Sequence, residues 1–413
     1  MHLLVIGINY APEQTSVAPF TTGLCEHLVK QGHHVSVITA FPYYPQWRIQ
    51  DRYRGLVYKH EIINGVNVRR VIHFVPSKPR NLVQRLIHDI SFSFNAFLAI
   101  PLIGAFDGIY CSCPPPFVPT IAFLASRMRG VPYAIKLTDL ASEAATSLRI
   151  MQNKGKLAKL ARKIEMFNYK HATGISVLCP AFKENLIRNG VPEKKISIVP
   201  DWADTKAIHP LPCENGFRRR TGISKDRYVA LHIGNMGLKQ GLDTVVEAAK
   251  ISEASSNGIL WLLVGDGEER RRLEQLAAGY NLLTLRFLPL QPSGAFLEVL
   301  ASADVLILSQ RANITDTVIP SKLLTYMAAG RPIIASVNSV SETARRIREA
   351  ECGLIVEPEN PLALVEAIQD LRGASAKAKC LGANGRSYVE QYFSKEAILK
   401  HYAHFMNNVF HFL

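Results

Sequence analysis

The stretch Asp316–Ser336 reads DTVIPSKLLTYMAAGRPIIAS and predicts a turn, a helix and a short buried strand in that order. Pro320 opens the turn, Ser321 follows where helices begin, and Gly330 stands where the helix would end. Free backbone N–H groups at such a helix start favour an anion, and Lys322 adds a positive charge beside them. A diphosphate would suit the site. The alternative is an ordinary helix–strand connection with a solvated lysine.

The same alternation of strands and helices extends over the whole chain of 413 residues. A polar, proline-rich segment from Pro200 to Gly222 divides it into two arrays of similar size. This pattern predicts an α/β protein with two Rossmann-like domains facing across a cleft. We expect a first domain over 1–200, a linker over 201–226, a second domain over 227–390, and a C-terminal helix over 391–413 that can pack back on the first domain.

The composition limits the class of protein. Hydrophobic residues make up 48% and charged residues 20%, which is typical of a globular protein. A net charge of +14 attracts phosphorylated substrates, anionic lipids or nucleic acid. No basic tract is interleaved with aromatic residues, so we expect no nucleic acid as a partner. The seven cysteines lack zinc-ligand spacing and the thirteen histidines form no metal pattern, so we expect free thiols, a reducing compartment and no metal site.

Two features bear on contact with a membrane. Met1 leads directly into an apolar strand, so we expect no signal peptide. No apolar run reaches ~20 residues, so we expect no transmembrane helix. The segment Lys78–Phe106 begins with Lys78, Arg80 and Arg85 and continues as SFSFNAFLAIPLIGAF. It fits a helix lying in the membrane interface, and a core helix of the sheet is the alternative.

A second anion-binding pattern follows the first strand of the second array. The segment HIGNMGLKQGLDTVVEAA contains Gly234, Gly237 and Gly241, which let the backbone approach an anion, and Lys239, which can reach it. Together with the Lys322 stretch, this loop can hold the two phosphates of a nucleotide diphosphate. The first loop of the chain lacks G-x-G-x-x-G, which argues against a nicotinamide cofactor.

Five segments, taken in order, resemble family 4 glycosyltransferases. They are GINYAPEQ (Gly7–Gln14), FPYYPQW (Phe41–Trp47), VPDWADTKAIHP (Val199–Pro210), GNMGLKQGL (Gly234–Leu242) and VIPSKLLTYMAAGRPII (Val318–Ile334). The resemblance covers nearly the whole chain, and within the family it is to the bacterial colanic acid and exopolysaccharide fucosyltransferase group. It implies the GT-B fold and a retaining transfer of a sugar from GDP-fucose or a UDP-sugar to a lipid-linked saccharide.

The resemblance also implies roles for residues. The second domain would bind the donor through Gly234, Asn235, Gly237, Lys239, Gln240, Pro320, Ser321, Lys322 and Thr325. The implied hexosyl transfer needs no metal and no cofactor beyond the donor substrate, and the sequence has no D-x-D triplet. Lys239 and Lys322 would then balance the charge of the leaving diphosphate.

The first domain would bind the acceptor. Asp139 ends a predicted buried strand where the family places a catalytic or acceptor-orienting group, and Glu143 follows one helical turn later. The alternative is a helix-capping aspartate with a surface glutamate in the first turn. Asn9 and Glu13 of the first loop are candidates for the acceptor or cleft, although Glu13 fits a solvated loop carboxylate equally well.

Two departures from the family concern the donor. Many members have two glutamates eight positions apart near the Pro-Ser-Lys stretch, where this chain has Thr317 and Thr325. Many also have Arg and Lys in the glycine loop, where this chain has Asn235 and Gln240. The carboxylate that usually binds the ribose or the sugar is therefore missing at Thr325, which leaves the donor sugar and its nucleotide open.

The implied acceptor is a sugar linked to polyprenyl diphosphate. We therefore expect a cytoplasmic protein bound peripherally at the inner face of the cytoplasmic membrane. Two other functions fit the same fold: a nucleotide-sugar 2-epimerase, which needs no acceptor, and a non-catalytic nucleotide-binding relative. Hydrolase chemistry has no support, since neither a Ser-His-Asp order nor G-x-S-x-G is present.

Overall fold

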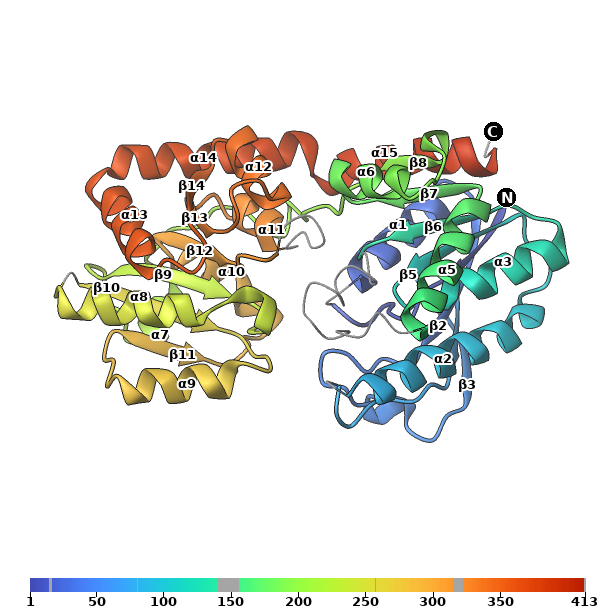
Figure 1. The fold of residues 1–413 in the computed structure, drawn as a ribbon, viewed down its shortest axis with the longest axis horizontal. Coiled ribbons are helices and arrows are strands. Elements are labelled where there is room, and N and C mark those ends of the chain that lie inside the picture. The colour runs from blue at the N-terminus through green and yellow to red at the C-terminus, as the bar shows by residue number, and fades with distance from the viewer. Residues whose placement is uncertain (15–16, 80, 140–155, 257, 315–321, 412–413) are drawn as a thin grey trace. The chain divides into compact units, whose positions relative to one another are not determined.

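The computed structural model describes residues 1–14, 17–79, 81–139, 156–256, 258–314 and 322–411. These residues form two compact units, each built around its own sheet (Figure 1). The first unit comprises Met1–Asp201 with Ile398–Leu413, and the second comprises Trp202–Ala397. Both are layered arrangements of helices on a mostly parallel sheet, which confirms the predicted α/β class.

The first unit contains an eight-stranded sheet in the order β3-β4-β2-β1-β5-β6-β7-β8. Neighbouring strands run parallel except β3 and β4, which pair antiparallel. β1 lies in the middle, and its residues from Leu3 on are fully buried, as expected of a continuous apolar strand covered on both faces. The strands are β1 (His2–Ile6), β2 (His34–Ala40), β3 (Tyr58–Ile63), β4 (Val66–Val71), β5 (Gly108–Cys113), β6 (Tyr133–Leu137), β7 (Gly174–Val177) and β8 (Ile196–Ile198).

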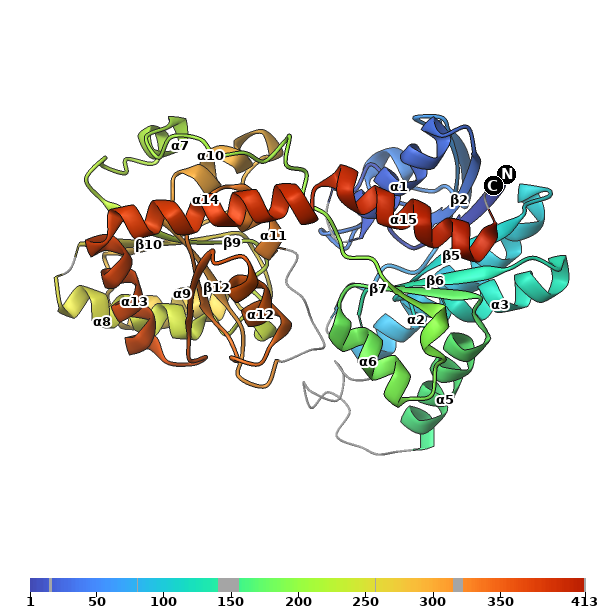
Figure 2. The ribbon, with the colours of Figure 1, turned by 90° about the horizontal axis from the view of Figure 1, so that it is seen from above.

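Helices cover both faces of this sheet. α1 and α15 pack on one face, and α2, α3 and α5 pack on the other (Figures 1 and 2). The helices are α1 (Ala18–Lys30), η1 (Asp51–Tyr53), α2 (Leu82–Ala99), η2 (Ile100–Ile103), α3 (Val118–Arg129), α5 (Lys156–His171), α6 (Pro180–Arg188), η3 (Glu193–Lys195) and α15 (Lys395–Phe410).

The last helix of the chain lies against the first sheet. A Cβ atom on Gly108 of β5 would lie 2.5 Å from the ring of Phe410, and one on Gly174 of β7 would lie 2.4 Å from Val409. The two glycines therefore allow α15 to sit directly on the strands (Figure 2). The C-terminal helix expected over 391–413 begins at Lys395, and from Ile398 on it belongs to the first unit.

The second unit contains a six-stranded parallel sheet in the order β11-β10-β9-β12-β13-β14. Its strands are β9 (Tyr228–Ile233), β10 (Ile259–Val264), β11 (Leu285–Leu288), β12 (Val305–Ser309), β13 (Ile333–Ser336) and β14 (Gly353–Val356). Its helices are α7 (Gly216–Arg220), η4 (Leu238–Gln240), α8 (Asp243–Ala254), α9 (Arg270–Gly279), η5 (Ser293–Ala295), α10 (Phe296–Ala301), α11 (Lys322–Ala328), α12 (Glu342–Glu349), α13 (Pro361–Gly373) and α14 (Ser375–Tyr392). One core joins residues of α8, α9 and α13 to the strands around the buried Trp261.

The segment expected as a linker, 201–226, is packed into the second unit from Trp202 on. Arg218 of α7 is buried, donates to the carbonyl of Ser302 at 2.8 Å and forms an ion pair with Asp304 at 2.8 Å. The polar, proline-rich composition of this segment had suggested a connection between the two domains. The structure instead uses one of the segment's charges inside the fold, so the segment is not a free linker.

The apolar segment before β5 is longer than the sequence analysis assumed. Among the described residues one helix, the 22 residues Leu82–Ile103, is long and apolar enough to cross a membrane by length and composition. The expectation that no run reaches this length was therefore wrong, because it counted only from Ser91. The same test is passed by core helices of proteins that cross no membrane, so it does not show a membrane span.

Candidate active site

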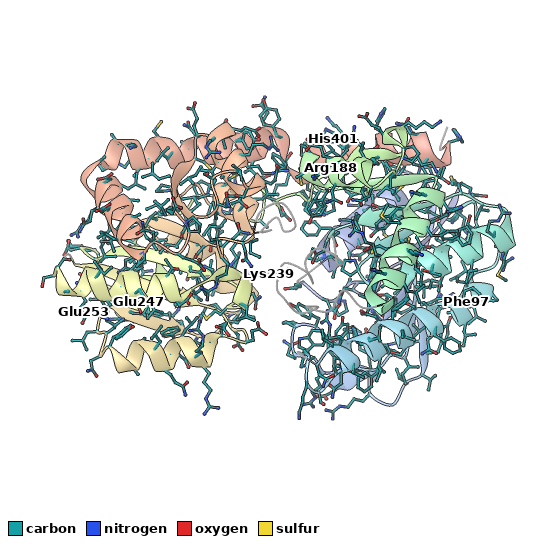
Figure 3. The ribbon with its side chains drawn as sticks, viewed as in Figure 1. Phe97, Arg188, Lys239, Glu247, Glu253 and His401 are labelled. Carbon is teal, nitrogen blue, oxygen red and sulfur yellow. The ribbon has the colours of Figure 1, made fainter. Side chains whose placement is uncertain are left out.

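The carboxyl end of β9 is where the second sheet favours a ligand. β9 and β12 are neighbours, and the chain continues from them toward opposite edges of the sheet. Ligands of open α/β sheets bind beyond the strand ends at such a switch point. The loop that follows β9 holds the predicted residues from Gly234 to Gln240. Figure 3 labels Lys239 of this loop at the edge of the second unit, with Glu247 and Glu253 further along α8.

Side chains of this loop hold its own backbone. Oε1 of Gln240 accepts a hydrogen bond from the backbone N–H of Gly237 at 3.0 Å. A Cβ atom on Gly237 would lie 3.0 Å from Nδ2 of Asn235, so both polar side chains lie against this glycine. Gln240 was predicted to bind the nucleotide sugar. In the structure its side chain stabilises the loop itself.

A second glycine loop, after β10, packs on the first. A Cβ atom on Gly265 would lie 2.0 Å from the carbonyl oxygen of Gly234, so only glycine fits there. The backbone N–H of Met236 donates to the carbonyl of Asp266 at 2.8 Å, and that of Glu269 donates to Met236 at 2.9 Å. The sequence analysis did not include this loop, although the two glycines of VGDGEE after an apolar strand were a usable signal.

Lys322, the first residue of α11, reaches the same place. Its Nζ lies 3.2 Å from Nε2 of His232, a fully buried residue of β9. A Cβ atom on Gly234 would lie 3.4 Å from this Nζ, so the amine lies against the glycine loop. Burial lowers the pKa of Lys322 to about 7, and no carboxylate of the described residues offsets that desolvation. Burial, together with the Lys322 charge, lowers the pKa of His232 well below its usual value, so the imidazole is neutral.

Two more cations lie at this edge. Arg311, just after β12, donates to Asp243 at 2.8 Å and to Glu359 at 3.0 Å, so two carboxylates already neutralise its charge. Lys239 is half-buried, and its carbonyl accepts the backbone N–H of Arg311 at 3.0 Å. The lysines predicted from the sequence therefore stay the candidates for an incoming anion.

Four positions singled out in the sequence remain. Pro320 and Ser321 lie outside the described residues, as does Thr317. Thr325 is half-buried on α11, three residues beyond Lys322 and thus on a nearby part of the helix surface. Thr325 thus replaces the family's carboxylate on the same helix whose first residue, Lys322, contacts the glycine loop.

The first sheet has a switch point of its own, between β1 and β5. After β1, Asn9 donates through Nδ2 to Oε2 of Glu13 at 2.9 Å. Oε1 of Glu13 accepts the backbone N–H groups of Tyr43 at 2.9 Å and Tyr44 at 2.8 Å. Burial raises the pKa of Glu13, and these hydrogen bonds oppose the rise. Asn9 and Glu13 lie together, but Glu13 joins the loops after β1 and β2, so the alternative of a solvated carboxylate was wrong.

An aromatic cluster lies beside these loops. The ring of Tyr43 lies 4.8 Å from that of His73 and 4.9 Å from that of His88, centroid to centroid, and the Trp47 ring lies 5.7 Å from His88. The guanidinium of Arg85 lies 4.8 Å above the Trp47 ring. Burial lowers the pKa of His73 to about 3, so this imidazole is neutral. Tyr43, His73 and His88 are buried, so Trp47 with the Arg85 guanidinium is the part of the cluster that a ligand with an apolar face and polar edges can reach.

A comparison with curated proteins decides the family. The chain is 30% identical, over 97% of its length and 98% of the relative's, to the glycosyl transferase WcaI of Escherichia coli (strain K12), which is named for colanic acid biosynthesis. The chain belongs to this family of glycosyltransferases. Two family models agree with this assignment. The glycosyl transferase 4-like domain matches residues 15–202, and glycosyl transferases group 1 matches residues 214–388.

Solved structures support the fold of this glycosyltransferase. It superposes on sucrose-phosphate synthase from Thermosynechococcus elongatus with a TM-score of 0.75 and 20% identity, covering 99% of each chain. It superposes on HepE from Anabaena in complex with UDP with a TM-score of 0.74 and 13% identity, covering 98% of this chain and 100% of the other. The two Rossmann-like sheets are those of a GT-B glycosyltransferase, as the resemblance implied.

The two carboxylates proposed for catalysis differ in what can be said of them. Asp139 of the glycosyltransferase is half-buried and follows β6, beside β5 at the switch-point edge of the first sheet. Glu143 lies outside the described residues. The same strand carries Lys136, which is buried and forms an ion pair with Asp201 at 3.0 Å; sequence reasoning gave this pair no attention because 65 residues separate its members.

Metal binding was not expected of this glycosyltransferase. Over the part of the chain that the structure describes, no group of three His, Cys, Asp or Glu side chains is placed to hold a metal ion. That the reaction proceeds without a metal stays a prediction.

Proposed function

We propose that this glycosyltransferase moves a sugar from a nucleotide-diphosphate sugar to a lipid-linked saccharide during the synthesis of an exopolysaccharide or another cell-surface glycan. GDP-fucose and UDP-sugars are the donors we propose, and polyprenyl diphosphate is the lipid carrier of the acceptor. The name of WcaI supports a polysaccharide product, and HepE, which has a similar fold, has been solved with UDP and with UDP-glucose.

The observation that carries the proposal is the contact between Lys322 and the glycine loop. The Nζ of Lys322 is directed against Gly234 and His232 at the switch point of the second sheet. The ammonium form of this lysine is desolvated there. A diphosphate against the loop would restore the interactions that burial removes, because an opposite charge within about 4–6 Å favours the charged form.

The proposed reaction exchanges one bond at the anomeric carbon. The bond to the diphosphate oxygen breaks, a bond to the acceptor hydroxyl oxygen forms, and the hydroxyl proton is released. Negative charge grows on the departing diphosphate, and Lys322 with Lys239 would stabilise it. Asp139, and Glu143 with it, are proposed to orient the acceptor hydroxyl. Retention of the anomeric configuration and independence of a metal belong to this proposal.

The first unit is proposed to bind the acceptor sugar beside the aromatic cluster. Trp47 is only half-buried, and Arg85 stacks on its ring. A half-exposed indole can pack on a sugar ring, and the guanidinium beside it can donate hydrogen bonds to hydroxyl or phosphate oxygens. We place the protein in the cytoplasm at the inner face of the cytoplasmic membrane, where a polyprenyl-linked acceptor would be met.

The test is a matrix of nucleotide sugars against a polyprenyl-diphosphate-linked sugar, read out as product mass. We expect transfer from one donor class, and transfer that depends on the acceptor. Lys322→Ala should weaken nucleotide binding by roughly 1.5–3 kcal/mol, as removal of a charge-assisted contact does. Leu283→Gln, an exposed change in the same unit, is the control and should leave it unchanged.

The two other functions predict different results in the same matrix. A nucleotide-sugar 2-epimerase would convert the donor without any acceptor. A non-catalytic relative would bind a nucleotide and produce nothing with any pair. Unchanged affinity in Lys322→Ala would reject the proposed donor site itself.

A further inference from the structure

The outer face of α2 carries a continuous row of exposed apolar side chains. Phe94 is 60% exposed and Leu98 is 56% exposed, on a helix whose opposite face is buried. The exposed members of the row are Leu82, Val83, Leu86, Ile87, Ile90, Phe94 and Leu98 on α2, continued by Leu102 on η2. Exposed apolar residues recur every three to four positions, with adjacent pairs at Leu82–Val83 and Leu86–Ile87, which places the row along one side of the helix. Exposed Leu, Ile and Phe residues are ordinary singly, but a row of this length marks an interaction surface.

The neighbouring elements extend this surface. α3 contacts α2 (Figure 1), and its Leu124 and Met128 are exposed, Met128 by 71%. The connection from β4 to α2 adds the exposed Ile72 and Phe74. We call the row on α2 together with these four side chains the α2 surface. Figure 3 labels Phe97 on the same helix.

The α2 surface has basic residues at both ends. Lys78 and Arg85 are exposed near the start of α2. Arg127 and Arg129 are exposed at the end of α3, and Arg129 lies 5.8 Å from the ring of Phe106, just beyond the far end of α2. Cations around an apolar strip are what an anionic bilayer surface attracts, since both the charges and the apolar side chains gain there.

The buried side of α2 shows that the helix lies on the sheet. Nδ1 of His88 donates to the carbonyl of Phe74 at 2.6 Å, and its Nε2 lies 3.1 Å from the hydroxyl of Tyr43. Asn95 donates to the carbonyl of Ile72 at 3.0 Å. A helix that crossed the bilayer would lose these bonds and expose the buried Phe92 and the sheet beneath. These contacts argue that α2 stays on the sheet and does not cross a bilayer.

We propose that the α2 surface docks the protein onto an anionic bilayer, with α2 lying in the plane of the headgroups. A second copy of the chain is the other occupant to consider. Pairing the α2 surface with itself about a twofold axis would place like surfaces face to face and gather the basic residues of both copies in one interface. An anionic lipid surface neutralises the same residues, so the charges favour the membrane.

Docking would also position the acceptor site. The start of α2 contacts the aromatic cluster through His88 and Arg85, at the edge of the first sheet where the acceptor is proposed to bind. This step rests on the proposed function, whereas the docking itself does not. The sugar of a polyprenyl-diphosphate-linked acceptor would then reach the aromatic cluster while its lipid stays in the bilayer.

The experiment is flotation of the full-length protein with vesicles of phosphatidylglycerol and phosphatidylethanolamine, compared with pure phosphatidylcholine. The test variant combines Leu86→Gln, Ile90→Gln and Phe94→Gln. The control variant combines Leu283→Gln, Val340→Gln and Leu362→Gln, three exposed apolar residues of the second unit. We expect the test variant to lose at least about tenfold in binding to the anionic vesicles, because three membrane-facing side chains are lost, and the control to bind as the parent does.

A second arm isolates the charges. Arg127→Gln with Arg129→Gln should weaken binding at low salt and have little effect at high salt, because surface attraction is screened. The proposal is overturned if the parent ignores anionic vesicles at low salt, or if the test variant floats as well as the parent. It is also overturned if sedimentation without lipid shows a parent dimer that the test variant cannot form.

The reaction gives an independent readout. With a short-chain, water-soluble acceptor, the test variant should turn over as the parent does, while with acceptor embedded in vesicles it should be slower. If the parent shows no activity toward the soluble acceptor, that result counts against the proposed function. It leaves the docking result unaffected.

Discussion

At the scale of the residue, Lys322 is held in the free protein at an electrostatic cost. Its ammonium group is desolvated against His232 and the glycine loop, and its pKa falls to about 7. Burial removes water from the ammonium group. A bound anion compensates for part of that lost hydration, so a buried lysine gains more from an anion than a solvated lysine does. If Lys322 binds the donor as proposed, the site is prepared electrostatically before the donor binds.

We expect nucleotide-sugar affinity to fall as the pH rises above about 7, the pKa of Lys322 in the free protein. A bound diphosphate raises that pKa, so above it the amine must take up a proton on binding, at a cost of up to about tenfold in Kd per pH unit. Below it the amine already carries the proton, and the affinity is level. The phosphates of a nucleotide sugar do not titrate in this range, which keeps the ligand constant.

Isothermal calorimetry in two buffers of different ionisation enthalpy measures the proton uptake directly. Lys322→Met is the control, and its weaker binding should show neither the uptake nor the slope. An equal slope in parent and variant would assign the pH dependence to another group.

The sequence indicated some of these residues and not others. Gly234, Gly237 and Lys322 were identifiable because glycine and lysine next to a strand or helix end have a local meaning. His232 was only one of thirteen histidines without a metal pattern, since its partner Lys322 is 90 residues away. The stacking of Arg85 on Trp47 was hidden for the same reason: Arg85 was linked only to headgroups.

At the scale of elements, the apolar strands were the best predicted feature, because a strand covered on both faces is apolar throughout. The hairpin of β3 and β4 was missed, although Asn64-Gly65 at its turn is a hairpin signal. The packed segment around α7 was missed because its polar, proline-rich composition is typical of a linker. The second error arises because a tertiary partner, Asp304 for Arg218, overrides local polarity.

The contact between the two glycine loops makes a prediction for these elements. We expect Gly265→Ala to lower the free energy of unfolding of the second unit by about 2–4 kcal/mol, since its Cβ would lie 2.0 Å from the carbonyl oxygen of Gly234 and its φ of +141° is strained for alanine. Donor affinity should fall as well, because the loop must move. Chemical denaturation with nucleotide titration measures both effects.

Gly279→Ala is the matched control. A Cβ atom there meets nothing within 4 Å, and the residue ends α9, so the change should be neutral or stabilise by up to about 1 kcal/mol. If both variants are equally stable, the two loops are not in the contact described here.

At the scale of the whole molecule, the proposed chemistry makes a prediction about metals. Lys322 and Lys239 are proposed to supply the positive charge that the leaving diphosphate needs. We therefore expect transfer activity to survive EDTA with its rate unchanged. Abolished activity that magnesium or manganese restores would contradict the proposed metal-independent reaction, while leaving the membrane docking untouched.

The path of the chain gives the last prediction, because the first unit is completed by residues from the far end of the sequence. Phe405 and Val409 of α15 are buried on the sheet of the first unit, next to Gly174. We expect Phe405→Ala with Val409→Ala to destabilise the first unit by about 3–5 kcal/mol or more, through lost burial and the cavity left behind. His401→Ala changes an exposed residue of the same helix, labelled in Figure 3, and should stay within about 0.5 kcal/mol.

Calorimetry should show the loss in the melting of the first unit, while nucleotide binding by the second unit persists. A fragment of residues 1–201 should for the same reason fail to fold alone, since its sheet would expose the face that α15 covers. A fragment of 202–397 should remain folded and bind nucleotide. A stable, cooperatively melting fragment 1–201 would contradict this account, because it would show that α15 is dispensable and that the first unit folds before the chain is complete.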